Sequence, residues 1–194
     1  LVVERLPNTR ILRYGPHDLH EYRGKFFPQL VRALMNIAKL PEGALVLDPF
    51  CGSGTTNVEA AVMGMKSIGM DLNPLSVKIS RAKVGLLYTE PETLQKETER
   101  LVAEIQGKSG ALPVPSLWDD SELKYLRNWF NETALREIDL IVSSIRGRSD
   151  QVLRNFWEIC LSNILRGISW QKEVDLRIRK EIGSYTQGTA VKRF

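Results

Sequence analysis

The residues with the clearest potential for chemistry form a glycine-rich run, DPFCGSGTT at 48–56, directly after a short apolar segment. A loop of this kind that leads into a helix surrounds a ligand with backbone N–H groups and a helix N-terminus. Asp48 stands at the mouth of the loop, where its charge repels a pyrophosphate and attracts a cationic ligand. Asp71 follows Gly54 by 17 residues and is placed to accept hydrogen bonds from a ribose diol. The spacing predicts a nucleoside-cofactor site; the structural alternative is a tight turn with an ordinary aspartate at a strand end.

The run departs from the two common phosphate-binding patterns. A Walker loop ending in the Gly-Lys-Ser at 107–109 would need a glycine where Val102 stands, and a preceding strand that the sequence does not indicate. A dinucleotide loop would carry its third glycine where Asn57 stands. S-adenosylmethionine carries a sulfonium and an ammonium, so it suits the acidic Asp48, and Leu72 is placed to cover one face of an adenine. We therefore predict S-adenosylmethionine as the cofactor.

Hydrophobic periodicity predicts the elements that position this loop. The expected order is a helix at 28–40, a strand at 44–47, the glycine-rich loop, a helix ending near 63, a strand at 66–70 and a helix at 74–83. The first helix is expected to turn Leu30, Leu34 and Ile37 inward. The unbroken apolar strand is typical of a strand buried on both faces of a parallel sheet. This order is the start of a doubly wound α/β sheet.

Beyond Tyr88 the strand signal ends and helical periodicity begins. Residues 93–105 predict an amphipathic helix, with Leu94, Leu101 and Ile105 inward. Asp119 and Glu122 form a capping-box pattern ahead of apolar residues that recur every three or four positions as far as Ile145. Gly147 ends that stretch, and Ser149 or Asp150 is expected to cap the next helix.

These patterns divide the chain into a cofactor-binding α/β part at 1–88 and a mainly helical region at 89–194. The 194 residues are 43% apolar and 26% charged, as in an ordinary globular protein. No segment approaches the roughly 18 consecutive apolar residues of a membrane helix, and the chain does not open on a basic-then-apolar signal segment. Two cysteines and two histidines exclude a disulfide framework and a zinc finger. We expect a cytoplasmic protein with no membrane partner and no metal.

The charge is concentrated at the C-terminal end. Residues 146–194 contain ten Lys and Arg against five Asp and Glu, a local excess of +5 within a total of +4. Such a segment suits a polyanionic partner and equally suits a solvated helical surface. The sequence leaves both interpretations open.

Three motifs resemble those of the DNA amino-methyltransferases, the S-adenosylmethionine-dependent enzymes that methylate adenine N6 or cytosine N4. VLDPFCGSGTT at 46–56 and GMDLNP at 69–74 look like their cofactor-binding core. HEYRGKFFP at 20–28 is similar to the H-x-Y-x-x-K-F-x-P segment that precedes the glycine loop in one branch. The helical part, with aromatic pairs at 129–130 and 156–157, resembles this branch more loosely. The resemblance implies a partial Rossmann-like methyltransferase fold with a helical insertion, DNA as partner and a place in restriction and modification.

In such enzymes the upstream segment closes over the cofactor, which would bring Lys25 and Phe26 near its methionine end. Taken singly, Lys25, Phe26 and Phe27 are interpreted as residues that support the fold rather than as ligand contacts. The cofactor-binding residues that the resemblance implies are Lys25, Phe26, Asp48, Phe50, Gly52, Ser53, Gly54, Thr55, Thr56, Asp71, Leu72 and Asn73.

No catalytic residue is predicted in this chain. Cytosine C5 methylation uses a cysteine in a separate loop beside a proline, whereas Cys51 lies within the cofactor loop and is interpreted as a small wall residue. Transfer to an exocyclic amine in this family needs an Asp/Asn/Ser-Pro-Pro-aromatic loop, and no two of the nine prolines are adjacent. Residues 139–145 resemble the strand that precedes that loop, but Arg146 and Gly147 follow, and helical periodicity is the better interpretation. Because the chain also begins at Leu1, we expect a fragment that stops before the catalytic loop.

The sequence therefore predicts the S-adenosylmethionine-binding part of a site-specific DNA methyltransferase, inactive by itself. It would need the missing C-terminal segment or a second chain to carry the catalytic loop. The alternatives are an RNA methyltransferase acting on tRNA, because the DPFCGSG loop also occurs among tRNA-modifying enzymes, and a non-catalytic cofactor- or nucleic-acid-binding subunit.

Overall fold

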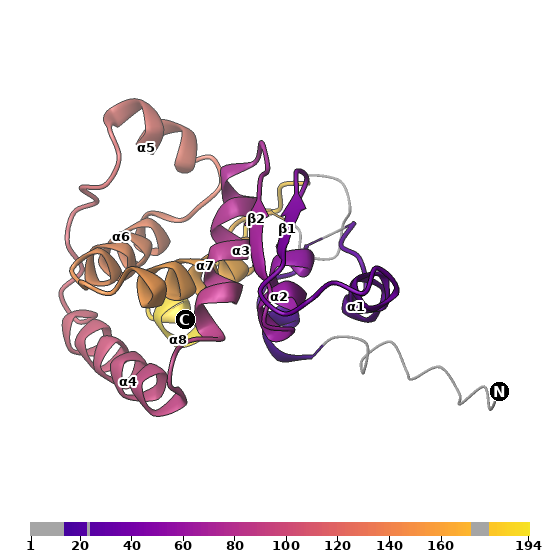
Figure 1. The fold of residues 1–194 in the computed structure, drawn as a ribbon. Helices are drawn as coiled ribbons and strands as arrows, with labels where there is room; N and C mark the ends of the chain where they lie inside the picture. Colours follow the sequence, from indigo (N-terminus) through magenta and orange to yellow (C-terminus); the bar gives the residue numbers. More distant parts are fainter. Residues whose placement is uncertain (1–13, 23, 172–178) are drawn as a thin grey trace, which may run out of the picture. The chain divides into compact units, whose positions relative to one another are not determined.

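The computed structural model describes residues 14–22, 24–171 and 179–194. It divides into two compact units, Leu1–Thr89 and Glu90–Phe194 (Figure 1). The first unit combines helices with a small parallel sheet, and helices dominate the second, so the chain is of the mixed α/β class. Within the described ranges, no helix has the length and apolarity that crossing a bilayer requires.

The first unit follows the predicted order of elements. Its elements are η1 (Gly15–Asp18), α1 (Pro28–Ile37), β1 (Leu45–Asp48), α2 (Thr55–Val62), β2 (Lys66–Gly69) and α3 (Pro74–Leu86). The two strands are parallel, with Leu45 opposite Lys66 and Asp48 opposite Gly69. Both strands therefore end at the same edge, where the glycine loop and Asp71 follow them.

The predicted inward face of α1 is wrong. Leu30, Leu34 and Ile37 are exposed, and the buried apolar residues of this helix are Val31 and Met35. These two pack with Ala60 and Met65 in the core of the first unit. The helix carries two neighbouring apolar stripes, and periodicity cannot tell which one meets a partner.

The prediction that β1 is buried on both faces is also wrong. Leu45 and Leu47 are 63% and 61% exposed, whereas Val46 between them is partly buried and packs on the core. Successive strand residues point to opposite faces, so the described helices of this unit cover only the face that carries Val46.

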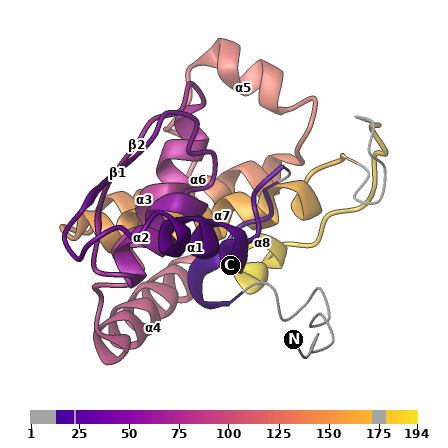
Figure 2. The same ribbon diagram turned by 45° about the vertical axis from the view of Figure 1, so that its right-hand side comes forward.

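The second unit contains α4 (Pro91–Lys108), α5 (Asp120–Leu126), α6 (Glu132–Arg146), α7 (Gln151–Ile168) and α8 (Thr189–Arg193). Figures 1 and 2 show α6 and α7 side by side, and their apolar faces share one core. Leu101 and Ile105 are buried in it and Leu94 packs against it, as predicted. The indole of Trp157 is buried there too, and its Nε1 donates to Thr98 Oγ1 at 3.1 Å.

Two helices replace the single apolar stretch predicted from Leu123 to Ile145. The capping box of Asp119 and Glu122 is confirmed, with Glu122 N donating to Asp119 Oδ1 at 2.8 Å. However, α5 ends at Leu126, and the side chain of Asn131 caps a new helix by accepting from Thr133 N at 2.8 Å. A capping residue interrupts a helix even where the apolar spacing continues across it. The expected cap at Asp150 is confirmed as well.

Two buried carboxylates on α6 hold neighbouring loops. Asp139 Oδ1 accepts from the backbone N–H groups of Ser116 and Leu117 at 2.7 and 2.9 Å. Glu137 accepts from Tyr185 Oη and from Ala190 N, and so caps the short helix α8. Residues 139–145 are therefore helical, as expected from their periodicity, and Asp139 has a structural role in this unit.

A buried carboxylate also organises the first unit. Glu59 on α2 is fully buried and accepts from Tyr14 Oη at 2.6 Å and from Arg32 Nε at 2.8 Å. Its Oε1 also lies 2.9 Å from Nε2 of the buried His17. This cluster ties η1 and α1 to α2. Burial raises the pKa of Tyr14 to about 12, helped by the adjacent carboxylate, and thus keeps its hydroxyl a proton donor.

Burial alone would raise the pKa of Glu59, but hydrogen bonds from His17, Tyr14 and Arg32 outweigh it and hold that pKa below its ordinary value. A carboxylate whose folded-state pKa is depressed stabilises the fold above the unfolded-state value, about 4.3. That stabilisation is lost as the pH falls through the depressed folded-state pKa.

We predict that Glu59→Gln lowers the free energy of unfolding of the first unit by about 3 kcal/mol at pH 7. This is the lower end for breaking a buried ion pair, because Arg32 stays partly in water. The deficit should begin to shrink as the pH falls below about 4.3, where the unfolded-state carboxylate takes up a proton, and shrink further as the pH falls through the depressed folded-state pKa of Glu59. Hydrogen exchange of α1 and α2 peptides across a urea series, at pH 7 and pH 3.5 (roughly one unit below the ordinary value), measures both effects.

The exposed carboxylate of Glu42, in the same unit, supplies the matched control Glu42→Gln, which should leave stability nearly unchanged. A deficit for Glu59→Gln that is equally large at both pH values would contradict the ionic role of Glu59.

Candidate cofactor-binding site

The glycine-rich loop is folded by its own backbone and by β2. Asp48 Oδ1 accepts from Phe50 N at 3.1 Å, which turns the chain as it leaves β1. Cys51 N then donates to Met70 O at 2.9 Å, and Gly54 N donates to Cys51 O at 2.7 Å before α2 begins. The loop is therefore fixed against the end of β2 as well as β1.

Gly54 is required by both conformation and space. Its φ is +78°, in the left-handed region where residues with a Cβ are strained. A Cβ there would lie 2.2 Å from Ser80 Oγ and 2.9 Å from Ser80 Cα, so α3 leaves no room for any side chain. Gly52, with φ +49°, is the second left-handed residue of the loop.

Helix α2 packs closely against strand β2 because β2 has a glycine, Gly69, at the point of contact. In a dinucleotide loop the third glycine lies in the helix. Here that helix position holds Asn57, which is buried and donates through Nδ2 to Ser67 Oγ at 3.1 Å. The strand position that faces it is Gly69, where a Cβ would lie 2.7 Å from Asn57 Oδ1.

Asp71 joins the loop to the start of α3. Its Oδ2 accepts from Gly52 N at 3.0 Å, and its Oδ1 accepts from Asn73 N at 2.8 Å. Asn73 in turn caps α3 by accepting from Leu75 N at 3.0 Å. Each carboxylate oxygen has a second lone pair, so Asp71 retains capacity to accept from a ligand.

The structure thus brings the predicted loop residues and 71–73 together at one end of the sheet, with differing exposure. Phe50 and Leu72 are fully open to solvent, and Asn73 is also exposed. Asp48, Gly52, Thr56 and Asp71 are partly exposed, and Ser53, Gly54 and Thr55 are buried.

The Ser53 hydroxyl is a buried polar group without a partner. The residue is 1% exposed, and its Oγ makes no hydrogen bond within the described part of the chain. A buried hydroxyl left unpaired destabilises a fold, so its presence in a loop of left-handed glycines fits a loop built to receive a ligand.

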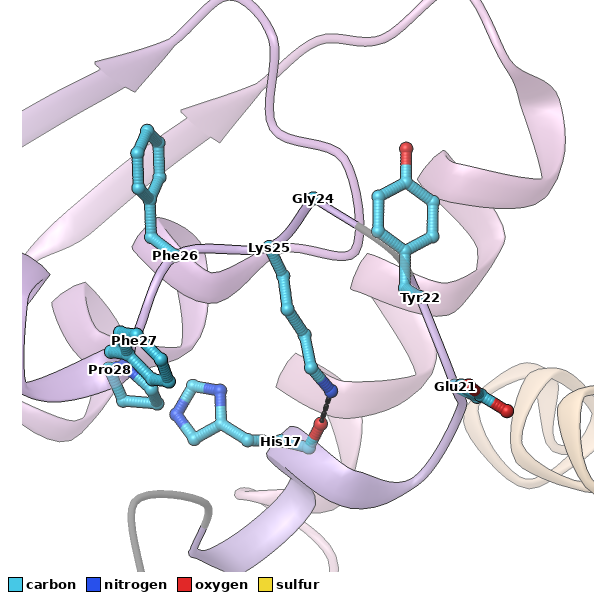
Figure 3. A pocket seen from close by; sticks show the side chains of 8 residues that line it. All are labelled: His17, Glu21, Tyr22, Gly24, Lys25, Phe26, Phe27 and Pro28. Carbon is cyan, nitrogen blue, oxygen red and sulfur yellow. Dashed lines mark hydrogen bonds between the residues drawn. The ribbon is translucent and has the colours of Figure 1, made fainter. Parts of the chain in front are cut away.

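Lys25 and Phe26 lie on a separate cavity of about 260 Å³ (Figure 3). Figure 3 shows their side chains extending in opposite directions. The Lys25 ammonium points to η1 and donates to His17 O at 2.9 Å, whereas Phe26 is exposed. The described residues that line this cavity all lie between His17 and Pro28.

Tyr22 was missed as a candidate and is the contact between the upstream segment and the glycine loop. A Cβ built at Gly52 would lie 3.1 Å from Tyr22 Cε1, so the ring lies directly against that glycine. The Tyr22 hydroxyl accepts from Ser76 Oγ on α3 at 3.1 Å. The sequence signal that could have identified Tyr22 is its position within the motif at 20–28.

Cys51 has the properties of a wall residue. Burial, and then the charges of Asp48 and Asp71, raise the pKa of its thiol, which disfavours the nucleophilic thiolate. Among the described residues, no group of three or more His, Cys, Asp and Glu side chains is arranged to hold a metal ion.

A known family is similar to the part of the chain that contains this site. Residues 19–107, which include the loop, Asp71 and the upstream segment, match the family described as UPF0020, RMKL-like, methyltransferase domain. No solved structure matches the chain.

Methyltransferases of two kinds are among the proteins similar to this chain. The Type II methyltransferase M.MvaI of Kocuria varians is 29% identical over 160 residues, which are 79% of this chain and 34% of that protein. The tRNA (guanine(10)-N2)-dimethyltransferase of Methanocaldococcus jannaschii is 27% identical over 190 residues, 93% of this chain and 48% of that protein. The Type II methyltransferase M.MjaII of the same organism is 43% identical over 68 residues, 35% and 13% of the two lengths. The chain thus spans less than half the length of each relative.

We predict that Gly54→Ala destabilises the first unit far more than Gly24→Ala. Both glycines have nearly the same φ, +78° and +79°, so both variants carry left-handed strain of about 1–2 kcal/mol. A Cβ at Gly24 meets no atom within 4 Å, whereas one at Gly54 overlaps Ser80, which adds about 1–3 kcal/mol. Hydrogen exchange of α2 and α3 peptides measures the difference. Equal losses in the two variants would refute the packing role of Gly54.

Proposed function

We propose that the first unit binds S-adenosylmethionine, and that the chain is the cofactor-binding part of an enzyme that methylates an exocyclic amine of a DNA base, adenine N6 or cytosine N4. The observation that carries this proposal is the link between Asp71 and Gly52 in a matched methyltransferase domain. That link holds an acidic acceptor beside a loop of left-handed glycines with an unpaired hydroxyl at Ser53.

The residues proposed to hold the cofactor follow from their chemistry. Asp71 has lone pairs for the ribose hydroxyls, and Leu72 offers an exposed apolar side chain for the adenine. Asp48 supplies a negative charge that suits the sulfonium and ammonium. The remaining proposed contacts are Phe50, Gly52, Ser53, Gly54, Thr55, Thr56 and Asn73, with Lys25 and Phe26 from the upstream segment. When bound, S-adenosylmethionine supplies an electrophilic methyl group.

We propose that the first unit is a partial Rossmann-like methyltransferase fold and the second a helical insertion. The parallel β1 and β2, joined through α2, support the first assignment. The exposed Leu45 and Leu47 are consistent with a sheet that is completed by further elements. A boundary close to Thr89 agrees with the division into two compact units.

Among the described residues, we identify no group that would activate the acceptor amine. Methyl transfer needs the amine nitrogen in line with the sulfonium, and hydrogen-bond acceptors that concentrate its lone pair. No Pro-Pro-aromatic loop occurs in the sequence, and the carboxylate of Asp139, beside which it was sought, is buried and bonded to Ser116 and Leu117. We propose that a further segment or a second chain supplies this loop.

A second candidate function is methylation of a guanine amine in tRNA. The relevant observation is the length of the match to the tRNA (guanine(10)-N2)-dimethyltransferase, which covers 93% of this chain and therefore both units. Guanine N2 is an exocyclic amine as well, so the proposed cofactor site serves either acceptor.

We predict that Ser53→Ala and Asp71→Ala both weaken S-adenosylmethionine binding in calorimetry, with opposite effects on stability. Loss of one neutral hydrogen bond at Ser53 should raise the Kd about 2- to 10-fold, and loss of the charged acceptor at Asp71 about 10- to 100-fold. Without ligand, Ser53→Ala should be as stable as wild type or more so, because it removes an unpaired buried hydroxyl. Asp71→Ala should be less stable, since it frees Gly52 N and Asn73 N. Unchanged Kd values beside the control Glu42→Gln would remove both residues from the site.

We predict that residues 1–194 alone bind the cofactor and transfer no methyl group. The measurement is incorporation of tritiated methyl into unmodified DNA and into unmodified tRNA, each against a control without protein. Incorporation above that control would contradict the proposed need for a separate catalytic loop, and the preferred nucleic acid would then decide between the two candidate functions. Failure to bind S-adenosylmethionine in calorimetry would overturn the cofactor assignment itself.

A further inference from the structure

Aromatic side chains gather around a groove in the second unit, between α5, the turn that follows α5 and the end of α7. The groove has a volume of about 410 Å³, within the range of small-ligand sites. Its lining includes Tyr125, Trp129, Phe130, Leu165, Arg166 and Gln171.

The groove has a packed floor and an open aromatic wall. Phe130 and Leu165 pack against the core of the second unit and form the floor. Tyr125 is 64% exposed, and Trp129 is partly exposed and takes no part in that core. The stability of the unit therefore does not account for these two rings in the wall.

Backbone hydrogen bonds hold the wall in place. Trp170 N donates to Trp129 O at 2.7 Å, which joins the end of α7 to the turn before α6. Gln171 forms an antiparallel bridge with Lys180, and Glu181 N donates to Trp170 O at 2.7 Å. These bonds fix the backbone at Trp129, and an aromatic ring on a fixed backbone loses less entropy when a planar ligand stacks on it.

The charge at the groove is cationic on the side of α7. Arg166 lines it, and Lys180 lies over the ring of Trp170, 5.2 Å from its centroid. Two carboxylates of the neighbouring helices have partners: Glu122 on α5 accepts from Asp119 N in the capping box, and Glu132 at the start of α6 is paired with Arg127. An anionic ligand with a planar apolar part fits this distribution.

We propose that this groove binds an unpaired nucleotide of a single-stranded nucleic acid, with the base stacked on Tyr125 and Trp129 and the phosphate near Arg166. Bases stack on aromatic side chains irrespective of sequence, and cations beside them hold the backbone. The excess of basic residues at 146–194 adds attraction for the rest of the strand. The inference goes beyond the proposed function, since it requires neither cofactor nor methyl transfer.

The test is fluorescence anisotropy of labelled oligonucleotides with the full chain, without S-adenosylmethionine. Single-stranded DNA, single-stranded RNA and duplex DNA of one sequence form three arms. We expect both single strands to bind more tightly than the duplex. Tyr125→Ala should weaken single-strand binding by about 5- to 100-fold, as for loss of one stacked base, and Tyr125→Phe should retain it.

Two matched variants control for general effects. Tyr88→Ala removes a tyrosine of similar exposure, 73% against 64%, from the first unit and should leave the affinity unchanged. Arg166→Gln should reduce the slope of log K against log salt by about 0.7, the value for one phosphate contact on a single strand. Arg100→Gln makes the same change of charge on α4, outside the groove, and should reduce the slope less.

Equal affinities of Tyr125→Ala and Tyr88→Ala for the single strands would overturn the proposal. So would tighter binding of the duplex, or binding of a proline-rich peptide that Tyr125→Ala abolishes while oligonucleotide binding persists. Tyr125 is exposed, so its variants should fold, and circular dichroism checks this. No arm of this experiment contains cofactor, so a negative result does not affect the proposal that the first unit binds S-adenosylmethionine. Conversely, a negative result in the calorimetry does not affect the proposal that the groove binds a nucleotide.

Discussion

The carboxylate of Asp71 bonds to two backbone N–H groups that come from opposite sides of the sheet edge. One belongs to Gly52 in the glycine loop, and the other to Asn73 at the start of α3. Hydrogen bonds within the loop and to Met70 give the loop its turns, and Asp71 adds the bond that holds Gly52, one of its two left-handed glycines. The same carboxylate therefore sets the loop and starts the helix whose Ser80 closes against Gly54.

A second carboxylate, that of Glu59, also joins several segments of the first unit by hydrogen bonds. Glu59 gathers Tyr14, His17 and Arg32 around α2, and so fixes the segment that leads to Tyr22. Tyr22 then reaches Gly52 and Ser76. The upstream motif is thus connected to the loop through a tyrosine ring and a buried ionic cluster, while its lysine is engaged by the carbonyl of His17.

The sequence was informative where one local pattern has one structural outcome. The order of elements around the glycine loop, the caps at Asp119 and Asp150, and the approach of Asp71 to the loop could all be predicted. It failed where the outcome depends on a distant partner. Whether α1 buries Val31 or Leu34 depends on where α2 lies, and whether Leu47 is covered depends on what packs on the sheet. Tyr22 contacts a loop that lies thirty positions further along the chain, and hydrophobic periodicity cannot predict such a contact.

Asn57 and Gly69 form a complementary pair: one supplies the side chain that fills the space the other leaves empty. Neither position can therefore change freely by itself. A larger residue at 69 would collide with the asparagine, and a glycine at 57 would leave a void beside the strand and free the hydroxyl of Ser67. The constraint belongs to the pair, so these two positions should covary among related chains, with small residues exchanged between helix and strand. A pattern that demands a glycine in the helix alone would overlook every chain that places it on the strand.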